Sequence, residues 1–202
     1  MEEKIAKIIS VIFHPLLIPT FTTLILFNIN SYISLLIPYE AKLLILAMIF
    51  ITTFLFPLLF IFIMKRRGII KSLQIETREE RVYPFAITAI FYFISYQMVR
   101  QLQISEIYYL FLLGSTFLIV VALLINFYSK ISIHMIGIGG LLGFLIGLSI
   151  RINTDVIILI FIVTLIAGFI GFARLKLSAH KPIQVYSGFI VGAIIMLIIF
   201  SI

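Results

Sequence analysis

Residues 107–127 read IYYLFLLGSTFLIVVALLINF, and this stretch decides the fold class of the chain. It contains no charged side chain. A helix needs about 20 apolar residues to cross the hydrocarbon core of a bilayer. Only helices and closed barrels satisfy all backbone hydrogen-bonding groups in lipid, and this run lacks the alternation of a barrel strand. The stretch therefore predicts a transmembrane helix.

The same pattern recurs along the whole chain. Of its 202 residues, 63% are hydrophobic and 11% are charged, whereas soluble domains have roughly 45–50% apolar and about 25% charged residues. The apolar segments are Ile5–Phe27, Ala41–Met64, Val82–Val99, Ile107–Phe127, Ile133–Ile150, Val156–Ala173 and Ile183–Ile202. We therefore predict an all-α polytopic transmembrane bundle of six to seven spans, forming one integral membrane domain over residues 1–202.

The first apolar segment is expected to be kinked or broken, because it contains His14, Pro15 and Pro19. A proline inside a helix removes a backbone donor and clashes with the preceding turn. His14 either lines a cavity or makes a structural polar contact, and the second is the simpler interpretation. The chain begins with Met-Glu-Glu, and no small-residue cleavage site follows the apolar run, so we expect no cleavable signal peptide.

The distribution of lysine and arginine predicts the topology. Seven spans place the N-terminus on the same side as the loops at 65–81, 128–132 and 174–182. Twelve of the fifteen basic residues lie on this side, whereas Lys42, Arg100 and Arg151 lie on the other. Cytoplasmic loops carry an excess of Lys and Arg, so the N-terminus and the basic loops are expected to be cytoplasmic in a cell-membrane protein. The basic residues sit in short loops, which makes nucleic acid a poor explanation of the +7 net charge.

Glycines form stripes on two of the expected helices. Gly139, Gly143 and Gly147 are four residues apart, as are Gly188 and Gly192. Small residues at this spacing let helices approach closely in a membrane. We interpret these stripes as packing surfaces.

The scarcity of acidic side chains narrows the range of reactions that the chain could catalyse. The only aspartate is Asp155, on the side away from the basic loops, while Glu76, Glu79 and Glu80 share one loop. Membrane enzymes that bind diphosphate through magnesium need clustered aspartates, because hard cations take oxygen ligands. Prenyltransferases and CDP-alcohol transferases are therefore poor candidates. With no cysteine to form disulfides or thiolate metal sites, we expect no metal or other cofactor and a chemistry that depends on His, Arg and Lys.

Two of the three histidines lie at helix ends on the basic side. His134 opens the fifth apolar segment two residues after Ser132, and Arg174 and His180 flank the connection between the sixth and seventh segments. Ionisable groups near bilayer depth are costly and usually functional. The alternative is that headgroups solvate each of them at the interface. Their spacing favours a shared site.

That spacing resembles the motifs of the type 2 phosphatidic acid phosphatase superfamily. Arg174, five residues, His180, three residues and Gln184 resemble its third motif, Ser-Arg, five residues, His, three residues, Asp. Ser132-Ile133-His134 resembles its second motif, Pro-Ser-Gly-His. The resemblance covers about residues 71–192.

The first motif of that superfamily, Lys, six residues, Arg-Pro, has a partial match. Lys71 and Arg78 have the right separation, but Glu79 stands in the place of the proline. Arg81, three residues before Pro84, is a rival match. Two apparent spans lie between residues 81 and 132, where the family usually has one extramembrane loop.

The resemblance implies a metal-independent phosphatase or phosphotransferase that acts on lipid phosphates. His180 would be the nucleophile and form a phosphohistidine, Gln184 would orient it, and His134 would protonate the leaving oxygen and then help to activate water. The phosphoryl oxygens would be bound by Arg174, Lys71, Arg78, Arg81 and Ser132. The lipid headgroup would enter the site while its tail stays in the bilayer.

Departures from the family motifs leave other functions open. Gln184 stands where the family has Asp, and a glutamine oxygen accepts a hydrogen bond without carrying charge. A catalytically silent binder or carrier of anionic lipid would keep the same basic residues. A small transporter would need mid-span ionisable residues or paired broken helices, for which only His14 and its prolines give a hint. The sequence does not predict the lipid or the oligomeric state.

Overall fold

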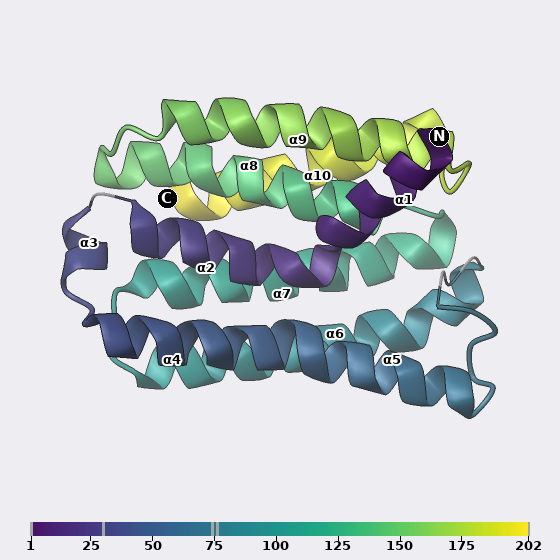
Figure 1. The fold of residues 1–202 in the computed structure, drawn as a ribbon, viewed down its shortest axis with the longest axis horizontal. Coiled ribbons are helices and arrows are strands. Elements are labelled where there is room, and N and C mark those ends of the chain that lie inside the picture. The colour runs from purple at the N-terminus through teal and green to yellow at the C-terminus, as the bar shows by residue number, and fades with distance from the viewer. Residues whose placement is uncertain (1, 30, 74, 76, 202) are drawn as a thin grey trace. The chain divides into compact units, whose positions relative to one another are not determined.

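In the computed structural model, which describes residues 2–29, 31–73, 75 and 77–201, seven helical stretches are long and apolar enough to cross a membrane. Every regular element in these residues is helical, so the predicted fold class is confirmed for this part of the chain. The elements, drawn in Figure 1, are α1 (Glu2–Ile12), η1 (Pro15–Leu17), α2 (Ile18–Asn28), α3 (Tyr32–Leu35), α4 (Tyr39–Phe50), η2 (Ile51–Leu55), α5 (Phe56–Arg66), α6 (Arg78–Gln101), α7 (Glu106–Tyr128), α8 (Ile133–Ile152), α9 (Ile157–Lys176) and α10 (Pro182–Ser201).

The helices divide into two compact units. The terminal unit joins Met1–Ile18 to Tyr128–Ile202, and the central unit is Pro19–Phe127. In the terminal unit, α1 packs against α9, and α8 packs against both α9 and α10. Figure 1 shows this pairing of the purple N-terminal helix with the green α9. The expectation of a single membrane domain over residues 1–202 stays a prediction.

The first apolar segment is interrupted, as its prolines predicted. Helix α1 ends at Ile12, and His14 has an extended backbone with φ −62° and ψ 136°. Pro15 then opens the short helix η1, and α2 follows. The helices α1 and α2 have 11 residues each, or roughly 16 Å at 1.5 Å per residue. Neither one alone crosses a hydrocarbon core of about 30 Å.

Helices α8 and α10 approach each other at their backbones. A Cβ atom built on Gly139 would lie 2.2 Å from the Phe189 carbonyl oxygen, and one on Gly143 would lie 2.0 Å from that of Ala193. From the opposite helix, a Cβ on Gly192 would lie 2.2 Å from the Ile136 carbonyl oxygen. The packing role of the glycine stripes is therefore confirmed, and it brings the N-terminal ends of α8 and α10 together.

The central unit contains a feature that the sequence analysis did not predict. Between α4 and α5 the helix continues through a π-helical turn at Ile51–Leu55. Pro57 has no backbone N–H, so the carbonyl of Thr53 has no partner four residues on, and such sites commonly distort a helix. The Thr52 and Thr53 hydroxyls donate to the Met48 and Ile49 carbonyls, each at 2.8 Å.

Candidate functional site

The terminal unit brings together most of the side chains that the motifs singled out. Ser132 is the N-cap of α8 and His134 lies in its first turn, while Arg174 lies in the last turn of α9. His180 lies in the connection that follows, and Gln184 lies in the first turn of α10. The close contact of α8 with α10 and the short α9–α10 connection bring these helix ends to one place.

His180 is paired with Gln184. The ring Nδ1 lies 3.2 Å from Oε1 of Gln184, and the same oxygen accepts a hydrogen bond from the Lys181 backbone N–H at 3.1 Å. A backbone N–H can only donate, which fixes the amide oxygen on this side, so Nδ1 of His180 is the second donor to it. In the neutral ring, Nε2 then carries the lone pair. His180 itself is 7% exposed, which holds the ring in one orientation.

His134 is held by the backbone of the N-terminal helix. Its Nε2 lies 3.1 Å from the Ser10 carbonyl oxygen. A carbonyl can only accept, so Nε2 carries the proton and Nδ1 is the nitrogen left for chemistry. Nδ1 of His134 is buried and has no hydrogen-bond partner within the part of the chain that the structure describes.

Two further buried polar atoms lack partners near the same helix ends. They are Nε of Arg174 and Oγ of Ser132, again counting only described residues. The guanidinium is anchored through Nη1, which donates to Oγ of Ser10 at 3.4 Å. Native proteins leave few buried polar atoms unpaired, and each such atom requires an explanation. With His134 Nδ1 they make three, and a polar ligand bound here would satisfy them.

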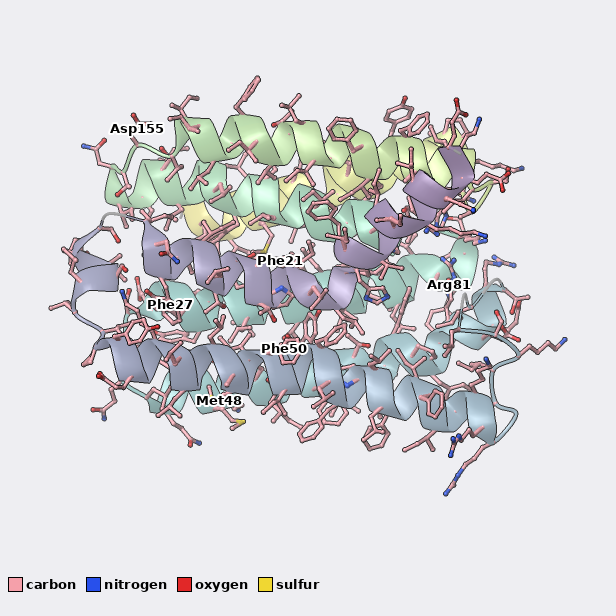
Figure 2. All side chains as sticks on the ribbon, in the orientation of Figure 1. Phe21, Phe27, Met48, Phe50, Arg81 and Asp155 are labelled. Atoms are coloured by element: carbon pink, nitrogen blue, oxygen red, sulfur yellow. The ribbon has the colours of Figure 1, made fainter. Side chains whose placement is uncertain are left out.

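The electrostatics of this cluster favour an anion. His134 lies within electrostatic range of Arg174, His14 and His180. Ser132 makes no side-chain cap hydrogen bond at the N-terminus of α8, and helix N-termini attract negative charge. Asp155 is remote from this end, because it lies between the C-terminal end of α8 and the start of α9. Its Oδ1 accepts a hydrogen bond from the Ile157 N–H at 3.0 Å, and Figure 2 labels its position. It therefore does not replace the carboxylate that Gln184 lacks.

Three of the predicted phosphate-binding residues, Lys71, Arg78 and Arg81, belong to the central unit, whereas the cluster belongs to the terminal unit. Lys71 and Arg78 are exposed at the loop before α6 and at its first residue. Arg81 is 7% exposed, and its Nε donates to the Ile75 carbonyl at 3.0 Å; Figure 2 labels this side chain. Their role in phosphate binding stays a prediction, and Glu76 of the same loop lies outside the described residues.

Ser10 and His14 are the site residues that sequence reasoning missed or left open. No motif marked Ser10, which joins the cluster only because α1 packs against α9. His14 makes the structural contact that its position suggested, since its Nδ1 accepts from the Leu16 N–H at 3.3 Å. It also lies beside His134, with ring centroids 5.6 Å apart and an edge-to-face angle of 78°.

Among the described residues, no group of three or more histidine, aspartate or glutamate side chains is placed to hold a metal ion. The groups that could meet a ligand are instead an arginine, a hydroxyl and imidazole nitrogens. No protein-family model, curated protein or solved structure matches the chain.

Proposed function

We propose that this chain is an integral membrane lipid-phosphate phosphatase, a divergent relative of the type 2 phosphatidic acid phosphatase superfamily. It would hydrolyse a lipid phosphomonoester or diphosphate through a phosphohistidine. The observation that supports this most is the pairing of His180 with Gln184 beside a second histidine and a half-buried arginine. An oriented imidazole next to an anion-binding group is the arrangement that nucleophilic phosphoryl transfer needs.

The first proposed step transfers the phosphoryl group to the enzyme. Nε2 of His180 attacks phosphorus, and the bond from phosphorus to the lipid oxygen breaks. To act as the acid, His134 must also carry a proton on Nδ1; it would then keep Nε2–H on the Ser10 carbonyl and give the Nδ1 proton to the leaving oxygen. The lipid alcohol, or the lipid monophosphate from a diphosphate, then leaves.

The second proposed step releases inorganic phosphate. Nδ1 of His134 takes a proton from water, and the water oxygen attacks the phosphohistidine. The phosphorus–nitrogen bond breaks and His180 recovers its lone pair, while the proton taken from water returns His134 to the acid form of the first step. Nε of Arg174 and Oγ of Ser132 have no hydrogen-bond partner among the described residues. Through both steps, these two atoms would donate hydrogen bonds to the phosphoryl oxygens. Lys71, Arg78 and Arg81 are proposed as further cationic contacts.

The membrane position follows from the same proposal. The seven apolar helices indicate an integral membrane protein. We place it in the cell membrane with the N-terminus and the loops at 65–81, 128–132 and 174–182 in the cytoplasm, following the excess of basic residues there. The phosphate headgroup would meet the helix ends, and the apolar tail would remain in the bilayer.

The first test is phosphate release from detergent-solubilised protein, with phosphatidate and a polyprenyl diphosphate as substrates. Gln184 stabilises an imidazolium less than a carboxylate does, and replacing an orienting Asp by its amide in a serine protease lowers kcat by about 10⁴. We therefore expect slow release in wild type, none in His180→Ala and faster release in Gln184→Asp. Absence of release in all three variants over a broad substrate panel would contradict the proposal.

A second function has one observation in its favour. Gln184 is neutral, while the basic and polar groups that would hold an anion are retained. A catalytically silent binder or carrier of anionic lipid would show lipid binding that survives His180→Ala and weakens in Arg174→Ala. Turnover that requires His180 would eliminate this function.

A further inference from the structure

The broken first span carries a histidine with a fixed protonation pattern. His14 is the N-cap of η1, and its Nδ1 accepts the Leu16 N–H at 3.3 Å. An accepting Nδ1 carries no proton, so the proton of the neutral ring sits on Nε2. The backbone thus fixes His14 as a hydrogen-bond donor through Nε2.

This donor belongs to the same cluster as the residues of the second and third motifs. The ring of His14 contacts that of His134 edge to face, with centroids 5.6 Å apart. One turn earlier in the chain, Ser10 binds Arg174 through its hydroxyl and His134 through its carbonyl. The segment 10–14 therefore contacts both the group proposed to bind phosphate and the group proposed to protonate the leaving oxygen.

We infer that His14 is a further ligand-binding residue of this site, donating Nε2–H to an oxygen of a tetrahedral oxyanion that Arg174 also binds. The ligand class is a phosphate group, either inorganic or on a lipid headgroup. The inference rests on the proposed function for the phosphate chemistry of the site. It adds a donor from the first span, which lies outside residues 71–192.

Two substitutions separate this role from helix capping. His14→Asn places a side-chain oxygen where it can accept the Leu16 N–H, as asparagine commonly does at an N-cap, but it removes the Nε2 donor. His14→Ala removes both functions. Lys7→Ala is the control, because it removes an exposed positive charge from α1 outside the cluster.

The primary measurement is the affinity for inorganic phosphate, determined by calorimetry on detergent-solubilised protein, with thermal unfolding recorded for each variant. We expect His14→Asn to unfold near the wild-type temperature and to bind phosphate about tenfold more weakly, the loss of one hydrogen bond to a charged group. Lys7→Ala should bind as wild type does, and His14→Ala should also unfold earlier. Unchanged phosphate affinity in His14→Asn would show that His14 acts only as the N-cap of η1, and it would overturn the inference.

Parallel assays with phosphatidate in nanodiscs keep the two proposals apart. Turnover in wild type with unchanged affinity in His14→Asn would retain the phosphatase and remove the role of His14. A tenfold weaker affinity in His14→Asn without turnover in any variant would retain the role of His14 and remove the phosphatase. Binding of phosphatidate but not of inorganic phosphate assigns the site to a lipid headgroup, and the expected loss is then measured on phosphatidate. Absence of binding to either ligand overturns the inference.

Discussion

The three histidines differ in which ring nitrogen makes a hydrogen bond and in whether that nitrogen donates or accepts. Nδ1 of His14 accepts from a backbone N–H, Nε2 of His134 donates to a backbone carbonyl, and Nδ1 of His180 donates to a side-chain amide. Each partner can act in only one direction at that bond, so the partner decides which nitrogen of the neutral ring carries the proton. Motif spacing predicted that His134 and His180 belong together. It could not predict which nitrogen of each ring is hydrogen-bonded, because that depends on contacts such as the one between His134 and Ser10, 124 residues apart.

Ser10→Ala tests the positioning of Arg174. The substitution removes the hydroxyl that accepts from Nη1 at 3.4 Å and keeps the carbonyl that accepts from His134. One hydrogen bond of this kind contributes about 1 kcal/mol, so we expect kcat/KM for phosphatidate to fall about fivefold, mainly through KM. Ser10→Thr keeps a hydroxyl and should restore most of the loss. Equal kinetics for Ser10→Ala and wild type would show that Arg174 is held by other contacts.

At the scale of elements, the sequence predicted the helices well and their irregularities in part. The seven apolar segments match the seven helical stretches within a few residues, because a long apolar run in lipid has little alternative to a helix. The break at His14 was also predicted from its prolines. The π-helical turn at Ile51–Leu55, which lies just before Pro57, was missed, since hydropathy does not distinguish a π-helical from an α-helical turn.

Gly143→Ala tests the contact of α8 with α10. The added Cβ would lie 2.0 Å from the Ala193 carbonyl oxygen, so one helix must move away. Overpacking of this kind costs about 1–3 kcal/mol, and we expect a lower unfolding temperature in detergent. Phosphatase turnover should also fall, because Gln184 and Ser132 are joined by a backbone hydrogen bond of 3.2 Å between the starts of these helices.

Gly168→Ala is the matched control for this contact. Gly168 lies in α9, and a Cβ built on it has no heavy atom within 4 Å. Alanine is favoured over glycine inside a helix by about 1 kcal/mol, so this variant should be as stable as wild type or more so. If Gly168→Ala lost as much stability as Gly143→Ala, the loss in Gly143→Ala would not be specific to the α8–α10 contact.

At the scale of the whole molecule, the N-terminal residues fold with the C-terminal third of the chain. Met1–Ile18 and Tyr128–Ile202 form one compact unit, and the intervening segment forms another. Periodicity and hydropathy are local, so they predict which segments are helical but not which helices pair over such a separation. Long-range predictions came instead from the motifs, and the terminal unit shows one of them, the meeting of residues near 134 with those near 180.

The predicted membrane topology can be tested by labelling single introduced cysteines, because the chain itself contains no cysteine. Ser129→Cys and Gln101→Cys each place one thiol at an exposed position, on the basic side and on the opposite side respectively. The positive-inside rule predicts that an impermeant maleimide labels Gln101→Cys in intact cells and labels Ser129→Cys only after the membrane is opened. The reverse pattern would place the helix ends that carry His134 and His180 on the outer face. The phosphatase proposal would survive that outcome, since its chemistry depends on the cluster and not on the side, but its substrate would then have to be a lipid phosphate of the outer leaflet.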